Sequence, residues 1–185
     1  KIRLGWNDNE ITVIDTCKIL EKAGVSMITI HGRTRSQMYE GKANYNLIKM
    51  AKESVSIPII ANGDITSLDK AIEVLDYTKC DGIAIGRGAL GNPYLITQIK
   101  EYFETGRVLP PSTLEMQIAY LREHYDLLSK YKGEFVAVRE MRGIAPWYLK
   151  GFKNAKDFKI KFSMMKTEDE FFNIIDELEK SKITR

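Results

Sequence analysis

Two glycine-rich polar segments of this chain have the residue types and the spacing of a phosphate-binding site. Gly86-Arg87-Gly88 ends an apolar run that starts near Asp81, and Asn62-Gly63-Asp64 ends an earlier apolar run. Glycine lets an anion approach backbone N–H groups, and the arginine adds positive charge. The separation of about 24 residues suits one strand–helix unit, so the two segments are predicted to form one phosphate cup. Each segment alone is also compatible with an ordinary tight turn.

A third polar segment, His31-Gly32-Arg33-Thr34-Arg35, follows the apolar run 27–30. An imidazole can donate a hydrogen bond to a carbonyl or phosphate oxygen, and the two arginines add donors that suit a polyanion. A structural histidine is the alternative. Because function concentrates in loops at strand ends, we predict that this loop contributes to a binding site.

The polar segments alternate with patterns of strands and helices. Strands are predicted at 1–4, 27–30, 57–61 and 83–85, and helices at 9–23, 47–51 and 66–75. This alternation predicts a parallel sheet whose strands are buried on both faces. A doubly wound sheet and a TIM (β/α)₈ barrel both place ligands at the carboxyl ends of strands. Because no G-x-G-x-x-G follows the first strand, we favour the barrel, with residues 1–108 as its second half, strands 5–8.

The remaining residues predict a small all-α domain over 109–185. A helix at 94–105 and a linker-like break at 106–111 precede helices at 112–133, 135–150, 155–162 and 167–180. Arg139, Arg142 and Lys150 lie on the second of these four helices, where a basic face could bind RNA phosphates. A solvated helix face is the alternative.

Composition indicates a globular protein, with 44% hydrophobic and 29% charged residues. The net charge of +3 is small, so any nucleic-acid site must come from local clustering. Cys17 and Cys80 form no CxxC pair and join no histidine cluster, so neither a metal site nor a disulfide is predicted, and the cytoplasm is the expected compartment. No apolar run approaches the roughly 18 residues of a membrane span. The start at Lys1, inside a strand-like run, suggests a piece of a longer protein.

Four motifs occur in a fixed order: K-I-R-L-G at 1–5, I-H-G-R-T-R-x-x-x-Y-x-G at 30–41, I-A-N-G-D-I at 60–65, and D-G-x-x-I-G-R-G-A-x-G-N-P at 81–93. Together they resemble the carboxyl-terminal half of a bacterial tRNA-dihydrouridine synthase, nearest the B-type subfamily. R-E-M-R at 139–142 and W-Y-L-K-G at 147–151 resemble the tRNA-binding domain of that family. The resemblance covers essentially the whole chain.

The resemblance implies an FMN-dependent oxidoreductase that uses NADPH or NADH to reduce particular uridines of tRNA to 5,6-dihydrouridine. It implies that FMN is bound by Lys1, His31, Asn62, Gly63, Asp64, Gly86 and Arg87. It implies that tRNA is bound by Arg33, Arg35, Arg139, Arg142 and Lys150.

The proton donor of the family is a cysteine in an N-x-G-C-P context, which we expect upstream of Lys1. No catalytic residue is therefore assigned within this chain, and neither Cys17 nor Cys80 takes that role. We expect the isolated chain to be inactive. A half-barrel leaves two sheet edges and the inner face of its strands unpaired, so we also expect the chain to self-associate, or to be disordered at 1–4.

Two other functions are compatible with the same residues. Another FMN- or phosphate-binding TIM-barrel oxidoreductase, such as a dihydroorotate-dehydrogenase-like enzyme, would not bind tRNA. A non-catalytic RNA-binding module would bind tRNA without a flavin. Binding of tRNA and flavin colour therefore distinguish the three possibilities.

Overall fold

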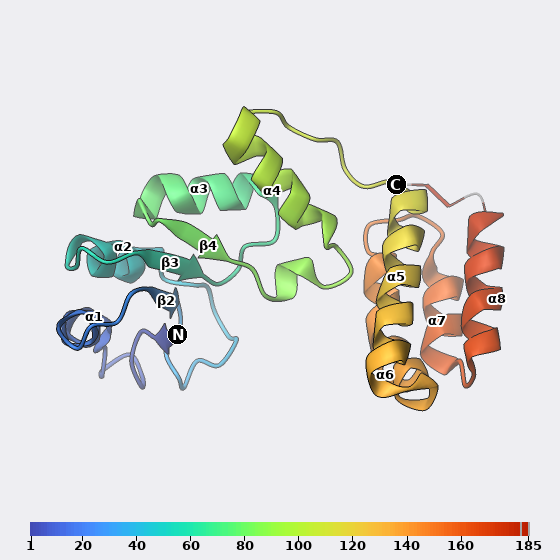
Figure 1. Ribbon diagram of the computed structural model, residues 1–185, viewed down its shortest axis with the longest axis horizontal. Coiled ribbons are helices and arrows are strands. Elements are labelled where there is room, and N and C mark those ends of the chain that lie inside the picture. The colour runs from blue at the N-terminus through green and yellow to red at the C-terminus, as the bar shows by residue number, and fades with distance from the viewer. Residues whose placement is uncertain (182, 185) are drawn as a thin grey trace. The chain divides into compact units, whose positions relative to one another are not determined.

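The computed structural model describes residues 1–181 and 183–184, so Arg185, the last residue of the predicted helical domain, lies outside it. The chain divides into two compact units, Lys1–Gly88 and Ala89–Arg185 (Figure 1). The first unit contains the strands and the second is helical. The predicted order of an α/β part followed by an all-α part is confirmed.

A parallel sheet of four strands forms the first unit. The strands are β1 (Ile2–Arg3), β2 (Ile28–His31), β3 (Ile59–Asn62) and β4 (Gly82–Ala84), and they lie in chain order. The register pairs Arg3 with His31, His31 with Asn62, and Asn62 with Ala84. The last residues of the four strands therefore lie side by side at the carboxyl edge of the sheet.

Three helices connect the strands: α1 (Val13–Lys22), α2 (Tyr45–Glu53) and α3 (Leu68–Thr78). The side chains of Asn44 and Ser67 cap α2 and α3 by accepting backbone N–H groups of their first turns. The helix predicted at 9–23 starts later than expected. The carbonyl oxygen of Leu4 accepts the N–H groups of both Thr12 and Val13, which holds the preceding residues against the end of β1.

Burial alternates along the central strands, so one face of the sheet is partly exposed, as expected for the inner face of a half-barrel. Ile28 and Ile30 of β2 and Ile59 of β3 are at most 2% exposed, whereas Thr29 and Ile60 are only partly buried. Period-two alternation places the buried set on one face, toward the connecting helices. All of β4 is partly buried, because it forms an edge of the sheet.

The amino-terminal strand is ordered, which contradicts the predicted disorder at 1–4. Ile2 and Arg3 pair with β2, and Leu4 is 2% exposed. Within the residues that the structure describes, β1 and β4 each have one unpaired edge. Self-association through these edges stays a prediction.

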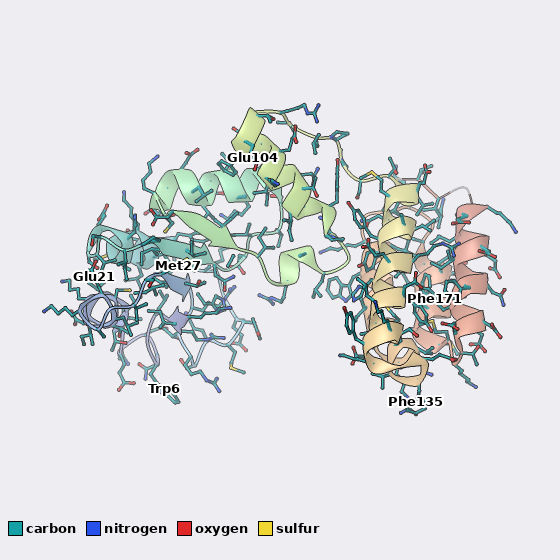
Figure 2. The ribbon with its side chains drawn as sticks, in the orientation of Figure 1. Trp6, Glu21, Met27, Glu104, Phe135 and Phe171 are labelled. Atoms are coloured by element: carbon teal, nitrogen blue, oxygen red, sulfur yellow. The ribbon has the colours of Figure 1, made fainter. Side chains whose placement is uncertain are left out.

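Four helices of the second unit pack as a bundle: α5 (Leu114–Lys132), α6 (Glu134–Tyr148), α7 (Lys156–Met164) and α8 (Glu168–Glu179). Helix α6 contacts each of the other three. Aromatic rings fill the centre: Tyr125 stacks on Phe171 with centroids 4.2 Å apart, and Phe162 lies 5.9 Å from Phe171. Figure 2 shows Phe171 among the helices and Phe135 at the outer end of the bundle. The four predicted helices are confirmed.

Helix α4 (Tyr94–Thr105) falls in the second compact unit, whereas the predicted domain boundary lies between 108 and 109. The functional limits of the two domains stay a prediction. In the described part of the chain, no helix has both the length and the apolar composition of a membrane span.

Gly91 fixes the segment before α4 onto the helical bundle. A Cβ atom at Gly91 would lie 2.3 Å from the backbone carbonyl carbon of Trp147, so a larger residue does not fit. The Nε2 atom of Gln117, a buried side chain, donates to the Gly91 carbonyl oxygen at 3.2 Å. This glycine of the G-N-P motif therefore serves helix packing.

Candidate functional site

The carboxylate of Asp64 is the centre of a charged cluster at the carboxyl edge of the sheet. Arg33 donates to it twice, at 2.9 Å to Oδ1 and 2.8 Å to Oδ2, and the backbone N–H of Ala43 donates to Oδ2 at 2.8 Å. Nη2 of Arg87 lies 3.8 Å from Oδ1. The three loops after β2, β3 and β4 thus meet at one carboxylate, as the spacing of the polar segments predicts.

The ionised form of Asp64 is favoured. Burial alone raises the pKa of this carboxyl, but the hydrogen bonds from Arg33 and Ala43, with the charges of Arg33 and Arg87, hold the pKa below its usual value. The residue also has a φ angle of 52°, in the left-handed region. Its carboxylate is therefore a fixed, compensated charge.

Arg33 has an internal role, which corrects its predicted contact with RNA. The residue is 2% exposed, and besides Asp64 its guanidinium donates to the carbonyl oxygens of Glu40 at 2.9 Å and Gly41 at 2.7 Å. Four of its five N–H donors are thus engaged inside the protein, which argues against a contact with an RNA phosphate. Arg35 is exposed and stays a candidate for RNA binding.

Arg87 is the accessible cation of the cluster. Its side chain is 57% exposed, and its guanidinium carbon lies 4.5 Å from the centre of the Tyr39 ring. The Tyr39 ring is in turn 6.4 Å from the His31 ring. In the sequence, Tyr39 was recognised as a motif residue but not as a residue of the site. Its position in the loop after His31 is the signal that could have placed it there.

His31 is 8% exposed and neutral at pH 7. Burial is the main cause that lowers its pKa, the charges of Arg3, Arg33 and Lys1 lower it further, and Asp64 has the opposite effect. A neutral imidazole offers one N–H donor and one acceptor nitrogen. The influence of Lys1 places that exposed terminal residue within electrostatic reach of the ring.

Asn62 and Gly63 shape the end of β3. Nδ2 of Asn62 donates to the carbonyl oxygen of Ala84 at 2.6 Å, which ties β3 to β4. Gly63 has a φ of 125°, and a Cβ atom there would lie 2.9 Å from the Cβ of Ala43 and 3.2 Å from Cδ2 of His31. The close approach predicted for a phosphate at this glycine is made by the protein's own side chains.

Tyr45, the first residue of α2, is a member of the site that sequence reasoning missed. Its hydroxyl donates to the Gly63 carbonyl oxygen at 2.5 Å. Burial, and next the charge of Asp64, raise the pKa of Tyr45 to about 12, so the hydroxyl keeps its proton and the hydrogen bond. No local pattern marks a contact between residues 18 positions apart.

The loop after β4 fits the phosphate group of a cofactor. Among the residues described, no acceptor takes the backbone N–H groups of Asp64, Gly86 and Arg87. A Cβ atom at Gly86 would meet nothing within 4 Å, so the backbone there borders open space. Unpaired N–H groups beside an accessible arginine are the donors that a phosphate accepts from. A short 3₁₀ turn, Arg87–Ala89, follows Gly86.

Of the predicted RNA-binding residues of the second unit, Arg139 and Arg142 lie on α6, and Lys150 lies two residues beyond its end at Tyr148. Arg139 and Lys150 are exposed. Arg142 is partly buried, and its Nε atom donates to the carbonyl oxygen of Met165 at 2.6 Å. Arg139 and Lys150 are therefore the two cations of this set that reach solvent without a hydrogen bond to a described residue.

The two cysteines lie away from the charged cluster. Both Cys17 in α1 and Cys80 before β4 are buried, and burial raises the pKa of each thiol. No group of three or more histidine, cysteine, aspartate or glutamate side chains suited to a metal ion occurs in the part of the chain that is described.

A model of the dihydrouridine synthase (Dus) family matches residues 1–184. The chain belongs to the dihydrouridine synthase family. It is 42% identical over 165 residues to a probable tRNA-dihydrouridine synthase of Rickettsia bellii, covering 89% of this chain and 51% of that protein. It is 41% identical over 182 residues to tRNA-dihydrouridine synthase B of Pasteurella multocida, covering 95% of this chain and 55% of that protein. It is 39% identical over 176 residues to tRNA-dihydrouridine synthase B of Shewanella oneidensis, covering 95% of this chain and 54% of that protein.

The chain thus spans about half the length of the curated relatives that it matches. Members of this family fold as TIM barrels, and the parallel sheet with its connecting helices is part of such a barrel. In a closed barrel the partly exposed face of the sheet points to the barrel interior. The helical bundle follows the barrel part, as predicted.

Proposed function

We propose that this chain is the carboxyl-terminal half of an FMN-dependent tRNA-dihydrouridine synthase, which reduces uridines of tRNA to 5,6-dihydrouridine in the cytoplasm with NADPH or NADH. The observation that carries the proposal is the meeting of His31, Asp64 and Arg87 at the carboxyl edge of a parallel sheet, in a chain of this family. That edge is where barrel enzymes bind their ligands.

The proposed FMN-binding residues are Lys1, His31, Asn62, Gly63, Asp64, Gly86 and Arg87. Arg87 would bind the phosphate together with the N–H groups of Asp64 and Gly86, because these donors have no competing acceptor among described residues. Asp64 would act as a positioning residue, since its carboxylate is already held by Arg33. Asn62 and Gly63 would hold the strand ends in place.

FMN, when bound, would supply the hydride for reduction of the uracil ring. The neutral imidazole of His31 would donate a hydrogen bond to a carbonyl oxygen without adding charge, and the Lys1 cation would stabilise negative charge on the ring system. The proton donor is proposed to be a cysteine outside this chain, because Cys17 and Cys80 are buried. For RNA, Arg35, Arg139, Arg142 and Lys150 stay the proposed contacts.

A chimera tests this proposal. The first half of the Pasteurella multocida relative, up to the residue before the one that matches Lys1, is fused to this chain and incubated with NADPH and tRNA that lacks dihydrouridine. We expect a yellow protein that forms dihydrouridine, detected by mass spectrometry of digested tRNA, while the 185-residue chain alone forms none. The intact relative is the positive control.

Two outcomes would replace the proposal. A chimera that binds FMN and oxidises NADPH with another substrate, but never modifies tRNA, would indicate a different barrel oxidoreductase. A folded chimera that binds tRNA and retains no flavin would indicate an RNA-binding module.

A further inference from the structure

Two aromatic rings on α6 are exposed, and each carries a cation on its face. Phe135 is 66% exposed, and the guanidinium carbon of Arg139 lies 3.8 Å from its ring centre. Trp147 is 44% exposed, with Nζ of Lys150 at 5.6 Å. Neither cation forms an ion pair with a carboxylate of the described residues. Each pair therefore combines an exposed aromatic ring with a positive charge that no described carboxylate pairs.

The two pairs are not part of the bundle core. The core face of α6 consists of other residues, namely Ala137, Val138, Met141, Ala145 and Tyr148. Between the pairs lies Gly143, where a Cβ atom would have no neighbour within 4 Å. At about 1.5 Å of rise per residue, Phe135 and Trp147 lie about 18 Å apart along the helix. The surface between them is open to a ligand that extends along α6.

A basic groove adjoins the Trp147 end of this surface. The groove has a volume of about 490 Å³ and includes Pro146 on α6, with Asn154, Lys156 and Lys159 on or beside α7. Its two lysines form no ion pair with a described carboxylate. The positive charge thus extends from α6 toward α7.

We propose that the pairs Phe135–Arg139 and Trp147–Lys150 bind unpaired nucleotides of RNA, each ring stacking on a base while its cation binds a neighbouring phosphate. An aromatic face stacks on any base, and a cation beside it matches the phosphate that every nucleotide carries. Bases within a duplex are already stacked, so this chemistry selects loops and single strands. The identification of the RNA as tRNA rests on the proposed function; the stacking itself does not.

The test measures binding of the 185-residue chain to a fluorescently labelled single-stranded RNA and to a duplex containing the same strand, without flavin or NADPH. The variants are Phe135→Leu and Trp147→Leu, which keep apolar bulk and remove the ring. Phe103→Leu is the matched control, because Phe103 is 49% exposed and no cation of the described residues lies over its ring.

We expect each of the two leucine variants to weaken single-strand binding by about 5- to 100-fold, with unchanged duplex affinity and salt dependence. Arg139→Ala should instead lower the slope of log affinity against log salt by about 0.7. In a Trp6→Phe variant, Trp147 is the remaining tryptophan, and its fluorescence should be quenched by RNA.

Wild-type affinity in both leucine variants would overturn the proposal, as would an equal loss for duplex RNA or for the Phe103→Leu control. Concentration-dependent dimerisation abolished by Phe135→Leu, without a change in RNA affinity, would assign the surface to a second copy of the chain. The RNA-binding assay contains no cofactor. A negative result there would overturn the stacking proposal alone, whereas a chimera that forms no dihydrouridine would count against the proposed function.

Discussion

The two units of the chain use their arginines in opposite ways. In the sheet unit, Arg33 is buried and donates its hydrogen bonds to Asp64 and to two backbone carbonyl oxygens. In the helical unit, Arg139 lies outside on the Phe135 ring, and aromatic residues such as Phe171 fill the core. Both arginines lie in segments that resemble functional motifs. Burial and existing partners decide which of them can meet a ligand.

The largest expected effect is loss of the central ring of the helical unit. Phe171 is fully buried and contacts three other rings, so Phe171→Ala should lower the free energy of unfolding by about 4 kcal/mol. Phe103→Ala, at an exposed ring, should cost less than about 1 kcal/mol. Urea denaturation gives both values. Equal losses would contradict an aromatic core as the source of stability.

Removal of the buried cation tests the sheet unit in the same way. Arg33→Met removes the two charged hydrogen bonds that hold the Asp64 carboxylate and should cost about 3 kcal/mol. Adding Asp64→Asn to that variant should recover part of the loss. The exposed Lys49–Glu53 pair serves as control, and Lys49→Met should change stability by at most about 0.5 kcal/mol. A loss no larger than the control's would mean that Arg33 is not structural.

The stability supplied by Asp64 should depend on pH in a predictable direction. Its folded pKa is lowered, so its contribution is fully present above the unfolded value near 3.9 and is lost as the pH falls through the folded pKa. Unfolding curves of wild type and Asp64→Asn should therefore converge in acid. A difference between the two variants that stays constant as the pH falls through the acid range would contradict this.

Two glycines should respond with opposite signs. Gly63→Ala places a side chain at φ 125° and 2.9 Å from Ala43, and should destabilise the protein by about 2 kcal/mol. Gly143→Ala, inside α6 with open space around it, should stabilise by about 0.5–1 kcal/mol. Thermal unfolding measures both. A neutral Gly63→Ala would show that the end of β3 is adaptable.

The smallest effect concerns His31. Its midpoint in a proton NMR titration should lie below 6.5, and Arg3→Met should raise it, because the Arg3 charge lowers the pKa of this ring. Since the folded pKa is the lower one, stability should fall slightly as the pH drops below about 6.5 toward the folded value. A midpoint above 6.5 would contradict a buried neutral imidazole.

Sequence patterns predicted the strands, most helices and the meeting of the polar loops, because periodicity and glycine positions are local signals. They failed where a distant partner decides the outcome. Arg33 and Asp64 are 31 positions apart, and nothing local shows that the arginine is buried in that ion pair. The late start of α1 depends on the carbonyl oxygen of Leu4, which accepts the N–H groups of Thr12 and Val13. Tyr39 and Tyr45 were missed for the same reason, because their contacts with Arg87 and Gly63 join residues far apart in the sequence.

The central claim is that two separate sites bind two different ligands, a cofactor phosphate at Arg87 and RNA at the Phe135–Arg139 and Trp147–Lys150 pairs. The most direct test measures FMN content and RNA affinity in parallel on the chimera. Arg87→Ala should lose at least about tenfold in FMN affinity with unchanged RNA affinity, and Trp147→Leu should show the reverse. If Arg87→Ala keeps its flavin, or if either variant changes both measurements, the claim is wrong.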